Sequence, residues 1–318
     1  MAALPKRRDL GFVLLTGGVG LSVVLVVAAI AFELVRQSQL SIAKFGLSFW
    51  TNGIWDPVSG EFGARPFIWG TLYSSVLALL LATPISLGIA MFLSELCPQR
   101  MRQPLIFLTE LLAAIPSIVY GLWGIFVLVP AVRAVQTAFP DFLRQLPLFT
   151  GPTAGIGMMS AVLILAVMVI PFTSAVAREV LKAVPVAQRE AAYALGATQW
   201  EAIRAALFYA RTGIIGAVML GFGRALGETM AVTMVIGNNP QISLSLFQPQ
   251  YTMAAVLANE FTEAADELYL HALIEVGLVL FVITLLVNGA SRLLIWSMNR
   301  PPRARKVEPV AAPLGEAA

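Results

Sequence analysis

Six long apolar runs constrain the fold of this chain more than any other feature. They cover about Gly11–Val35, Phe67–Leu93, Leu105–Val132, Gly155–Val176, Phe208–Ile236 and Leu270–Ser297. A helix needs about 20 apolar residues to cross the hydrocarbon layer of a membrane, and every run is long enough. Only 12% of the residues are charged, whereas a soluble domain carries about 25%. The sequence therefore predicts an all-α, polytopic membrane protein with six transmembrane helices in one domain over residues 11–299.

Lys and Arg are distributed unevenly between the segments that connect these runs. With the N-terminus inside, the inner segments hold most of them, in clusters within residues 6–8, 178–211 and 292–306. Positively charged connections stay on the cytoplasmic side of a membrane, so we expect both termini there. The first run is longer than the apolar core of a signal peptide, and we expect an uncleaved helix after a basic N-terminus, 1–10. The Pro- and Ala-rich end, 300–318, predicts a disordered tail.

The scarcity of reactive residues excludes several classes of function. The chain has a single cysteine, Cys97, and a single histidine, His271, so we expect no metal site of the Cys or His type. Its basic residues do not form a stripe with interleaved aromatics, which argues against nucleic-acid binding and leaves membrane lipid as the expected surroundings. No GxxxxGK[ST] pattern is present. We therefore expect no cofactor and no enzymatic activity, and any ATP hydrolysis must come from a partner.

The cytoplasmic segment 178–207 predicts two helices joined at a glycine. Pro185 suits the first turn of a helix, strong helix formers continue to Leu195, and Gly196 suits its end. Thr198 is then a plausible N-cap, because Glu201 follows three residues later as in a capping box. The sequence predicts an exposed helix, a glycine, and a second helix that leads into the fifth apolar run.

The residues "EAAYALG", Glu190–Gly196, resemble the EAA motif of importer-type ABC permeases. The resemblance implies that Glu190, Ala191, Ala192 and Gly196 belong to a coupling helix that docks in a groove of an ATPase subunit. The family continues with Ile-x-Leu-Pro, but the corresponding positions here are 206–209, and the proline is missing. An ordinary amphipathic cytoplasmic helix is the alternative interpretation.

Arg224 and Glu228 are two charged residues inside the fifth apolar run. A charge at mid-membrane costs about 2.5–3.5 kcal/mol on insertion scales and marks a functional candidate. In one continuous helix a spacing of four places both side chains on the same face, so they can neutralise each other. Gly223 and Gly227 leave bare backbone beside them, and we include Thr229 in the same expected substrate path. A buried ion pair that fixes helix register is the structural alternative.

The chemistry of this pair suits a protonated tetrahedral anion. A guanidinium binds an oxyanion through two parallel hydrogen bonds. Phosphate near neutral pH keeps a proton that needs an acceptor, and the Glu228 carboxylate supplies one. Sulfate has no such proton, so the carboxylate would repel it, which is discrimination by an unpaired group.

The stretch "GRALGETMAVTMVIGN", 223–238, is similar to the phosphate-specific ABC permeases. "IPSIVYGLWG" and "WDPVSGEFGARPFIWGT" are similar to their PstC-type subunit, and the likeness extends over about Trp50–Trp296. It implies the importer-type permease fold, phosphate translocation at Arg224 and Glu228, and location in the bacterial cytoplasmic (inner) membrane. The implied partners are a second permease of the PstA type in a heterodimer, an ATP-binding subunit dimer and a periplasmic phosphate-binding protein.

Two other functions stay open at this point. A permease for sulfate or molybdate is the nearer alternative, which the Arg–Glu pair disfavours. An ion-gradient-driven anion transporter is the second, although such proteins usually contain inverted repeats.

Three further features carry smaller expectations. We expect Thr252–Phe261 to form a short helix on the outer side, Glu110 to lie at the membrane interface, and Glu275 to be paired or to face the interior of the bundle.

Overall fold

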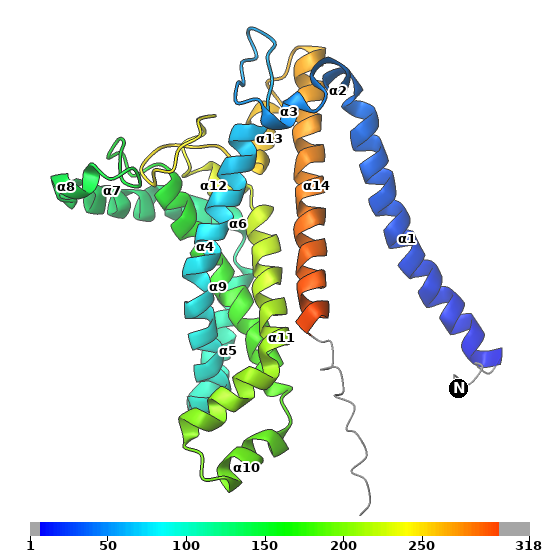
Figure 1. Cartoon of the computed structure of the whole chain (residues 1–318), viewed down its shortest axis with the longest axis vertical. Coiled ribbons are helices and arrows are strands. Elements are labelled where there is room, and N and C mark those ends of the chain that lie inside the picture. Colours follow the sequence, from blue (N-terminus) through cyan, green and yellow to red (C-terminus); the bar gives the residue numbers. More distant parts are fainter. Residues whose placement is uncertain (1–6, 299–318) are drawn as a thin grey trace, which may run out of the picture.

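The computed structural model describes residues 7–298, a chain of helices drawn in Figure 1. The elements are α1 (Arg7–Gln37), α2 (Gln39–Phe45), α3 (Ser48–Thr51), α4 (Arg65–Met91), the π-helical turn η1 (Phe92–Leu96), α5 (Gln99–Ala114), α6 (Ser117–Trp123), the π-helical turn η2 (Gly124–Leu128), α7 (Val129–Ala138), α8 (Asp141–Arg144), α9 (Met158–Lys182), α10 (Val186–Ala194), α11 (Gln199–Leu226), α12 (Met230–Thr233), α13 (Met253–Glu260) and α14 (Glu267–Met298). The expected tail 300–318 and the first residues of the basic N-terminus lie outside the described range.

Six helices in the described range are long and apolar enough to cross a membrane, which confirms the predicted number. They are Gly11–Gln37, Arg65–Leu96, Ser117–Ala138, Met158–Lys182, Gln199–Leu226 and Glu267–Met298.

Helix α9 forms the centre of the bundle. It packs most extensively against α4 and α11, and the three helices stand side by side in Figure 1. Small side chains on α4, among them Ala78, Ala82 and Ser86, are fully buried. Small residues let helix backbones approach closely in a membrane, where van der Waals packing replaces the hydrophobic effect between helices. The tightest packing of the chain therefore surrounds α9.

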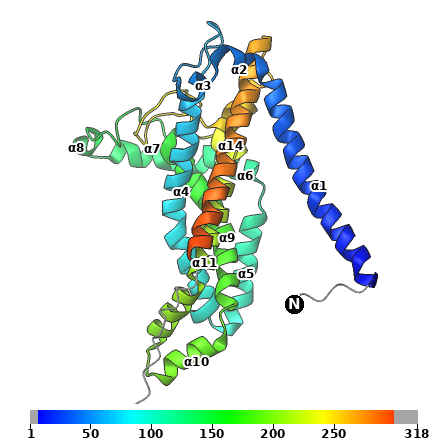
Figure 2. The same cartoon turned by 45° about the vertical axis from the view of Figure 1, so that its right-hand side comes forward.

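Helix α1 stands apart from this bundle in both views (Figures 1 and 2). None of its apolar span is buried within the chain, and it contacts α14 and α2. Its backbone groups are satisfied within the helix, so lipid or another apolar protein surface can cover its side chains.

The third predicted span, Leu105–Val132, was wrong as a single helix. Helix α5 ends at Ala114, Ile115 is extended, and α6 starts after Pro116. Proline has no N–H and disfavours helical conformation in the residue before it, so the helix stops there. The helix that continues through η2 into α7 reaches Ala138, and α7 lies across the direction of α14 (Figure 1).

The fifth predicted span, Phe208–Ile236, was also wrong as a single helix. Helix α11 ends at Leu226, with Gly227 at its C-cap, and only the short α12 follows. Helix α12 packs against α6, where Gly121 lies directly against Ala231 and Met234. This packing needs a change of chain direction, and glycine is the residue with the weakest helix propensity apart from proline.

Several local predictions were confirmed. Thr198 caps α11 and forms the capping box with Glu201, and α10 ends just before Gly196, whose φ is 82°. The short outer helix exists as α13, capped by Thr252, and its first turn is buried. Glu275 faces the interior with 2% of its surface exposed.

The close contact between α4 and the loop before α13 supports a stability prediction. A Cβ on Gly70 would collide with the backbone carbonyl of Tyr251, whereas a Cβ on Gly88 in the same helix meets nothing within 4 Å. We expect Gly70→Ala to lower the thermal midpoint of the detergent-solubilised protein, because backbone must move, at a cost of about 1–3 kcal/mol. Gly88→Ala is the matched control and should leave the midpoint unchanged or raise it. Equal midpoints for the two variants would contradict the prediction.

Candidate functional site

Arg224 lies in the last turn of α11 and its side chain is exposed on the isolated chain. Its guanidinium carbon is 5.5 Å from the centre of the Phe172 ring on α9, a cation–π distance. The C-terminal end of a helix carries partial negative charge, which favours a cation there. The position of Arg224 at a helix end therefore offsets part of the cost of its charge.

Glu228 lies beyond the end of α11, so the prediction that both charges share one helix face was wrong. The Glu228 carboxylate accepts a hydrogen bond from the backbone N–H of Ala231, 3.5 Å away, at the start of α12. Within residues 7–298, no ion pair joins Glu228 to Arg224. The break at Gly227 turns the carboxylate toward α12, which separates two groups that a continuous helix would bring together.

Because Glu228 is turned away, the Arg224 guanidinium forms no ion pair with a carboxylate of residues 7–298. Among the residues that the structure describes, no side chain forms a hydrogen bond or an ion pair with it; its guanidinium lies over the Phe172 ring and interacts electrostatically with Tyr120. An arginine has five N–H donors and no acceptor. Its donors thus remain available for a ligand or for another subunit.

Gly227 and Thr229 line a small pocket next to Arg224 in the sequence. The pocket has a volume of about 520 Å³ and is bounded by α13, α14 and Leu34 of α1. Its other lining residues are mostly apolar. Gly223 also faces α14, where a Cβ would come within 3.7 Å of the Asn288 amide oxygen. Of the five residues of the expected path, Gly227 and Thr229 line this pocket, whereas Gly223, Arg224 and Glu228 do not.

Helix α13 is held by a polar cluster at the outer ends of the helices. The Glu260 carboxylate accepts hydrogen bonds from the Trp55 indole N–H, 2.8 Å away, and from the Tyr269 hydroxyl, 2.6 Å away. The Asn259 amide donates to the Tyr251 hydroxyl at 3.1 Å, and burial raises the pKa of Tyr251 above its usual value. This cluster fixes the helix that forms one wall of the pocket at Thr229.

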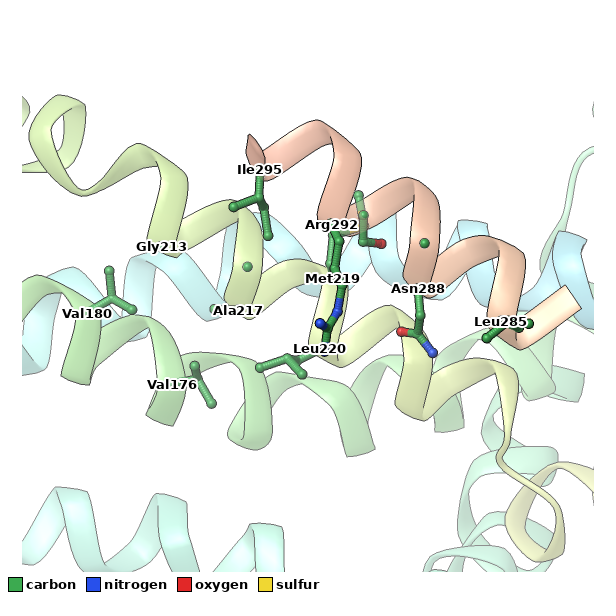
Figure 3. Close-up of a pocket in the computed structure, with 13 residues that line it drawn as sticks. Val176, Val180, Gly213, Ala217, Met219, Leu220, Leu285, Asn288, Arg292 and Ile295 are labelled. Atoms are coloured by element: carbon green, nitrogen blue, oxygen red, sulfur yellow. The ribbon is translucent and has the colours of Figure 1, made fainter. Parts of the chain in front are cut away.

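A cavity of about 810 Å³ lies between α9, α11 and α14 (Figure 3). Asn288 and Arg292 extend into it from α14, while Ala217 and Leu220 of α11 form the opposite wall. The sequence analysis treated Arg292 only as a charge that sets topology. Arg224 and Glu228 do not line this cavity.

Three of the predicted coupling residues lie on the exposed helix α10, beyond the ends of the upright helices in Figure 1, and Gly196 follows in the turn after it. Glu190, Ala191 and Gly196 are exposed and Ala192 is half-buried. Leu195 next to them is 90% exposed, although leucine is normally buried. A hollow of about 410 Å³ at the end of the helix includes Ala192, Gly196 and Glu201. The arrangement is a protruding helix with small side chains and exposed apolar surface.

Two ion pairs at the cytoplasmic side were not found by sequence reasoning. Arg178 is buried on α9 and its Nη2 is 3.0 Å from the Glu110 carboxylate on α5. Arg189 on α10 pairs with Glu95 on η1 at 2.6 Å. The partners are far apart in the chain, so no spacing rule could have related them.

The six apolar helices define a multi-pass membrane protein, and the family that it matches places it among the transport components of the bacterial inner membrane. Residues 85–299 match the family described as binding-protein-dependent transport system inner membrane component. The chain belongs to this family.

Named relatives cover nearly the whole chain. The phosphate transport system permease protein PstC of Haemophilus influenzae is 48% identical over 286 residues, 88% of this chain and 90% of the relative. PstC of Mesorhizobium japonicum is 44% identical over 290 residues, 89% of each chain.

A solved structure supports the fold. The MetNI methionine ABC transporter in inward-facing conformations has a TM-score of 0.55, with 17% identity over 73% of this chain and 94% of the other.

Proposed function

We propose that the chain is the PstC-type permease subunit of an ATP-driven importer of inorganic phosphate, and that Arg224 is the anion contact. The observation that carries the proposal is a guanidinium at the end of a transmembrane helix that forms no ion pair with a carboxylate of residues 7–298. An uncompensated charge in a membrane is costly and marks a substrate path. The named relatives support phosphate as the anion.

The separation of Arg224 from Glu228 strengthens this chemistry. A guanidinium already bound to a carboxylate would have to exchange that partner for the anion. Here the Arg224 donors are free for two phosphate oxygens, and the Glu228 carboxylate keeps acceptor capacity for the phosphate hydroxyl because its one recorded bond is long, at 3.5 Å. Gly223, Gly227 and Thr229 give the anion room beside the backbone.

The partners in this proposal are those that the family resemblance implies, and we assign two of them to exposed surfaces of the chain. A second permease of the PstA type would complete the path at the Arg224 face, and an ATP-binding subunit dimer would receive α10 through Glu190, Ala191, Ala192 and Gly196. A periplasmic phosphate-binding protein would deliver the anion. ATP-driven closure of the ATPase dimer would then move α10 and change access to Arg224.

Anion selectivity tests the assignment of Glu228. In proteoliposomes with the complete complex, we expect Glu228→Gln to narrow the preference for phosphate over sulfate by about tenfold, because one charge-assisted hydrogen bond of about 1.5 kcal/mol is weakened. The measurement is uptake of each labelled anion at several concentrations. Glu228→Asp keeps the charge and should retain most of the preference. An unchanged preference in Glu228→Gln would refute the role.

The same assay distinguishes the other candidate functions. A sulfate or molybdate permease would prefer that anion in the wild-type complex. An ion-gradient-driven transporter would take up phosphate without ATP when a gradient is imposed. Uptake that requires both ATP and the partner subunits supports the importer.

A further inference from the structure

Arg189 of α10 joins three segments at the cytoplasmic end of the bundle. Its Nη2 and Nε lie 2.6 and 3.2 Å from the two carboxylate oxygens of Glu95. The same guanidinium donates to the backbone carbonyls of Leu181 and Val184, both at 3.0 Å. One side chain therefore links α10 to η1 and to the end of α9.

Little else holds α10 against the membrane helices. It has no buried residue, and α11 is its principal neighbour. Within the described range, its recorded side-chain hydrogen bonds and ion pairs all come from Arg189. If the Arg189 contacts were absent, a displacement of α10 would reach the bundle through α11 and through the short connection to α9, with no direct link to α4.

Glu95 is rigidly attached to the centre of the bundle through α4. It lies in η1, which continues α4 without interruption. Arg102 donates to the carbonyls of Ser94 and Cys97, at 3.2 and 3.4 Å, which holds the end of η1. Helix α4 in turn packs along α9 more extensively than any other pair of helices in the described chain. A force applied to Glu95 therefore reaches the centre of the bundle.

The geometry of the pair suits a mechanical link. Only 21% of the Arg189 side chain and 13% of the Glu95 side chain are exposed, so water screens the pair less than a surface ion pair. Two parallel N–H···O bonds fix direction as well as distance. An exposed single-bond pair such as Lys182–Glu179, within α9, offers neither property.

We propose that the Arg189–Glu95 pair transmits the movement of α10 to α4, so that α4 and α11 move together when the ATPase closes. This proposal rests on the coupling role of α10 in the proposed function. Arg189 and Glu95 are positioning residues, since neither lies near Arg224 or the expected path. If the pair is broken, ATP hydrolysis should continue, but less phosphate should be transported for each ATP hydrolysed.

The test measures phosphate transported per ATP hydrolysed in proteoliposomes that contain the complete complex. We expect Glu95→Gln and Arg189→Gln each to lower this ratio by about tenfold, within the range usual for coupling between distant sites. The double variant should be no worse than the lower single variant, because both remove one interaction. Lys182→Gln, which breaks the exposed pair at the same end of α9, should keep the wild-type ratio.

The ratio of phosphate transported to ATP hydrolysed distinguishes a loss of coupling from a destabilised fold. A destabilised complex loses uptake and hydrolysis together, and the ratio then stays constant. If Arg189→Gln fails to assemble, Glu95→Gln decides, because it leaves the bonds of Arg189 to Leu181 and Val184 in place. A wild-type ratio in Glu95→Gln would overturn the proposal while leaving the importer function intact. A wild-type complex without ATP-dependent phosphate uptake would overturn both.

Discussion

Replacing Arg224 by Gln should lower ATP-dependent phosphate uptake by about a hundredfold or more, because two charge-assisted hydrogen bonds of about 1.5 kcal/mol each are lost. The reason is that Arg224 forms no ion pair with any carboxylate in the part of the chain that the structure describes, so its charge is free for the anion. The variant removes a charge from an apolar environment and should not impair folding. The measurement is initial uptake of labelled phosphate by the reconstituted complex, with subunit assembly checked by size-exclusion chromatography.

Two further variants test whether the effect depends on the guanidinium geometry and on the position of Arg224. Arg224→Lys keeps the charge but loses the two parallel hydrogen bonds, so we expect an intermediate rate. Arg211→Gln is the matched control, because Arg211 lies on the same helix with its guanidinium carbon 4.4 Å from the Phe208 ring. It should retain wild-type uptake. Wild-type uptake in Arg224→Gln would eliminate Arg224 as the anion contact.

Replacing Gly196 by Val should reduce phosphate uptake by about tenfold, since a strain of 1–2 kcal/mol displaces the coupling helix. Gly196 has a φ of 82°, a left-handed conformation that β-branched residues avoid most strongly. No atom lies within 4 Å of a Cβ at this position, so the effect comes from backbone strain and not from a collision. The angle between α10 and α11 would change, and α10 would then fit the ATPase subunit less well.

Gly196→Asn is the control for this prediction. Asn tolerates the left-handed conformation better than other residues with a side chain, so it should retain most of the uptake. Co-purification of the ATPase subunit measures the fit directly, and we expect it to weaken in Gly196→Val alone. If both variants transported and bound the ATPase like wild type, the conformation of Gly196 would be irrelevant to coupling.

The features that sequence reasoning found are those with local causes. The capping box of Thr198 and Glu201 lies within one turn of chain, and its two hydrogen bonds need no other segment. The exposed helix α10 and the short helix α13 follow in the same way from residues near their ends. The two helix breaks were missed because Ile115–Pro116 and Gly227 lie inside apolar runs, where a kinked helix and a broken helix have the same composition.

The sequence identified one residue of the candidate site but not its relation to Glu228, because only the first has a local cause. The cost of a charge in lipid singled out Arg224 without any structure. Its relation to Glu228 depended on whether α11 continued past Gly227, which local propensity could not decide. The Arg189–Glu95 pair had no signal in the sequence, because its two residues are 94 positions apart and come together only in the folded bundle.

The amino-acid sequence by itself determined a six-helix membrane protein, its orientation, its exposed cytoplasmic helix and the unusual arginine. Length, apolarity and charge act residue by residue, so they can be read along the chain. Only the tertiary structure decided where the helices break, which charges remain without a partner, and how α10 is tied to α4. Those outcomes depend on packing between segments far apart in the chain, such as α12 against α6, and no local pattern records such contacts.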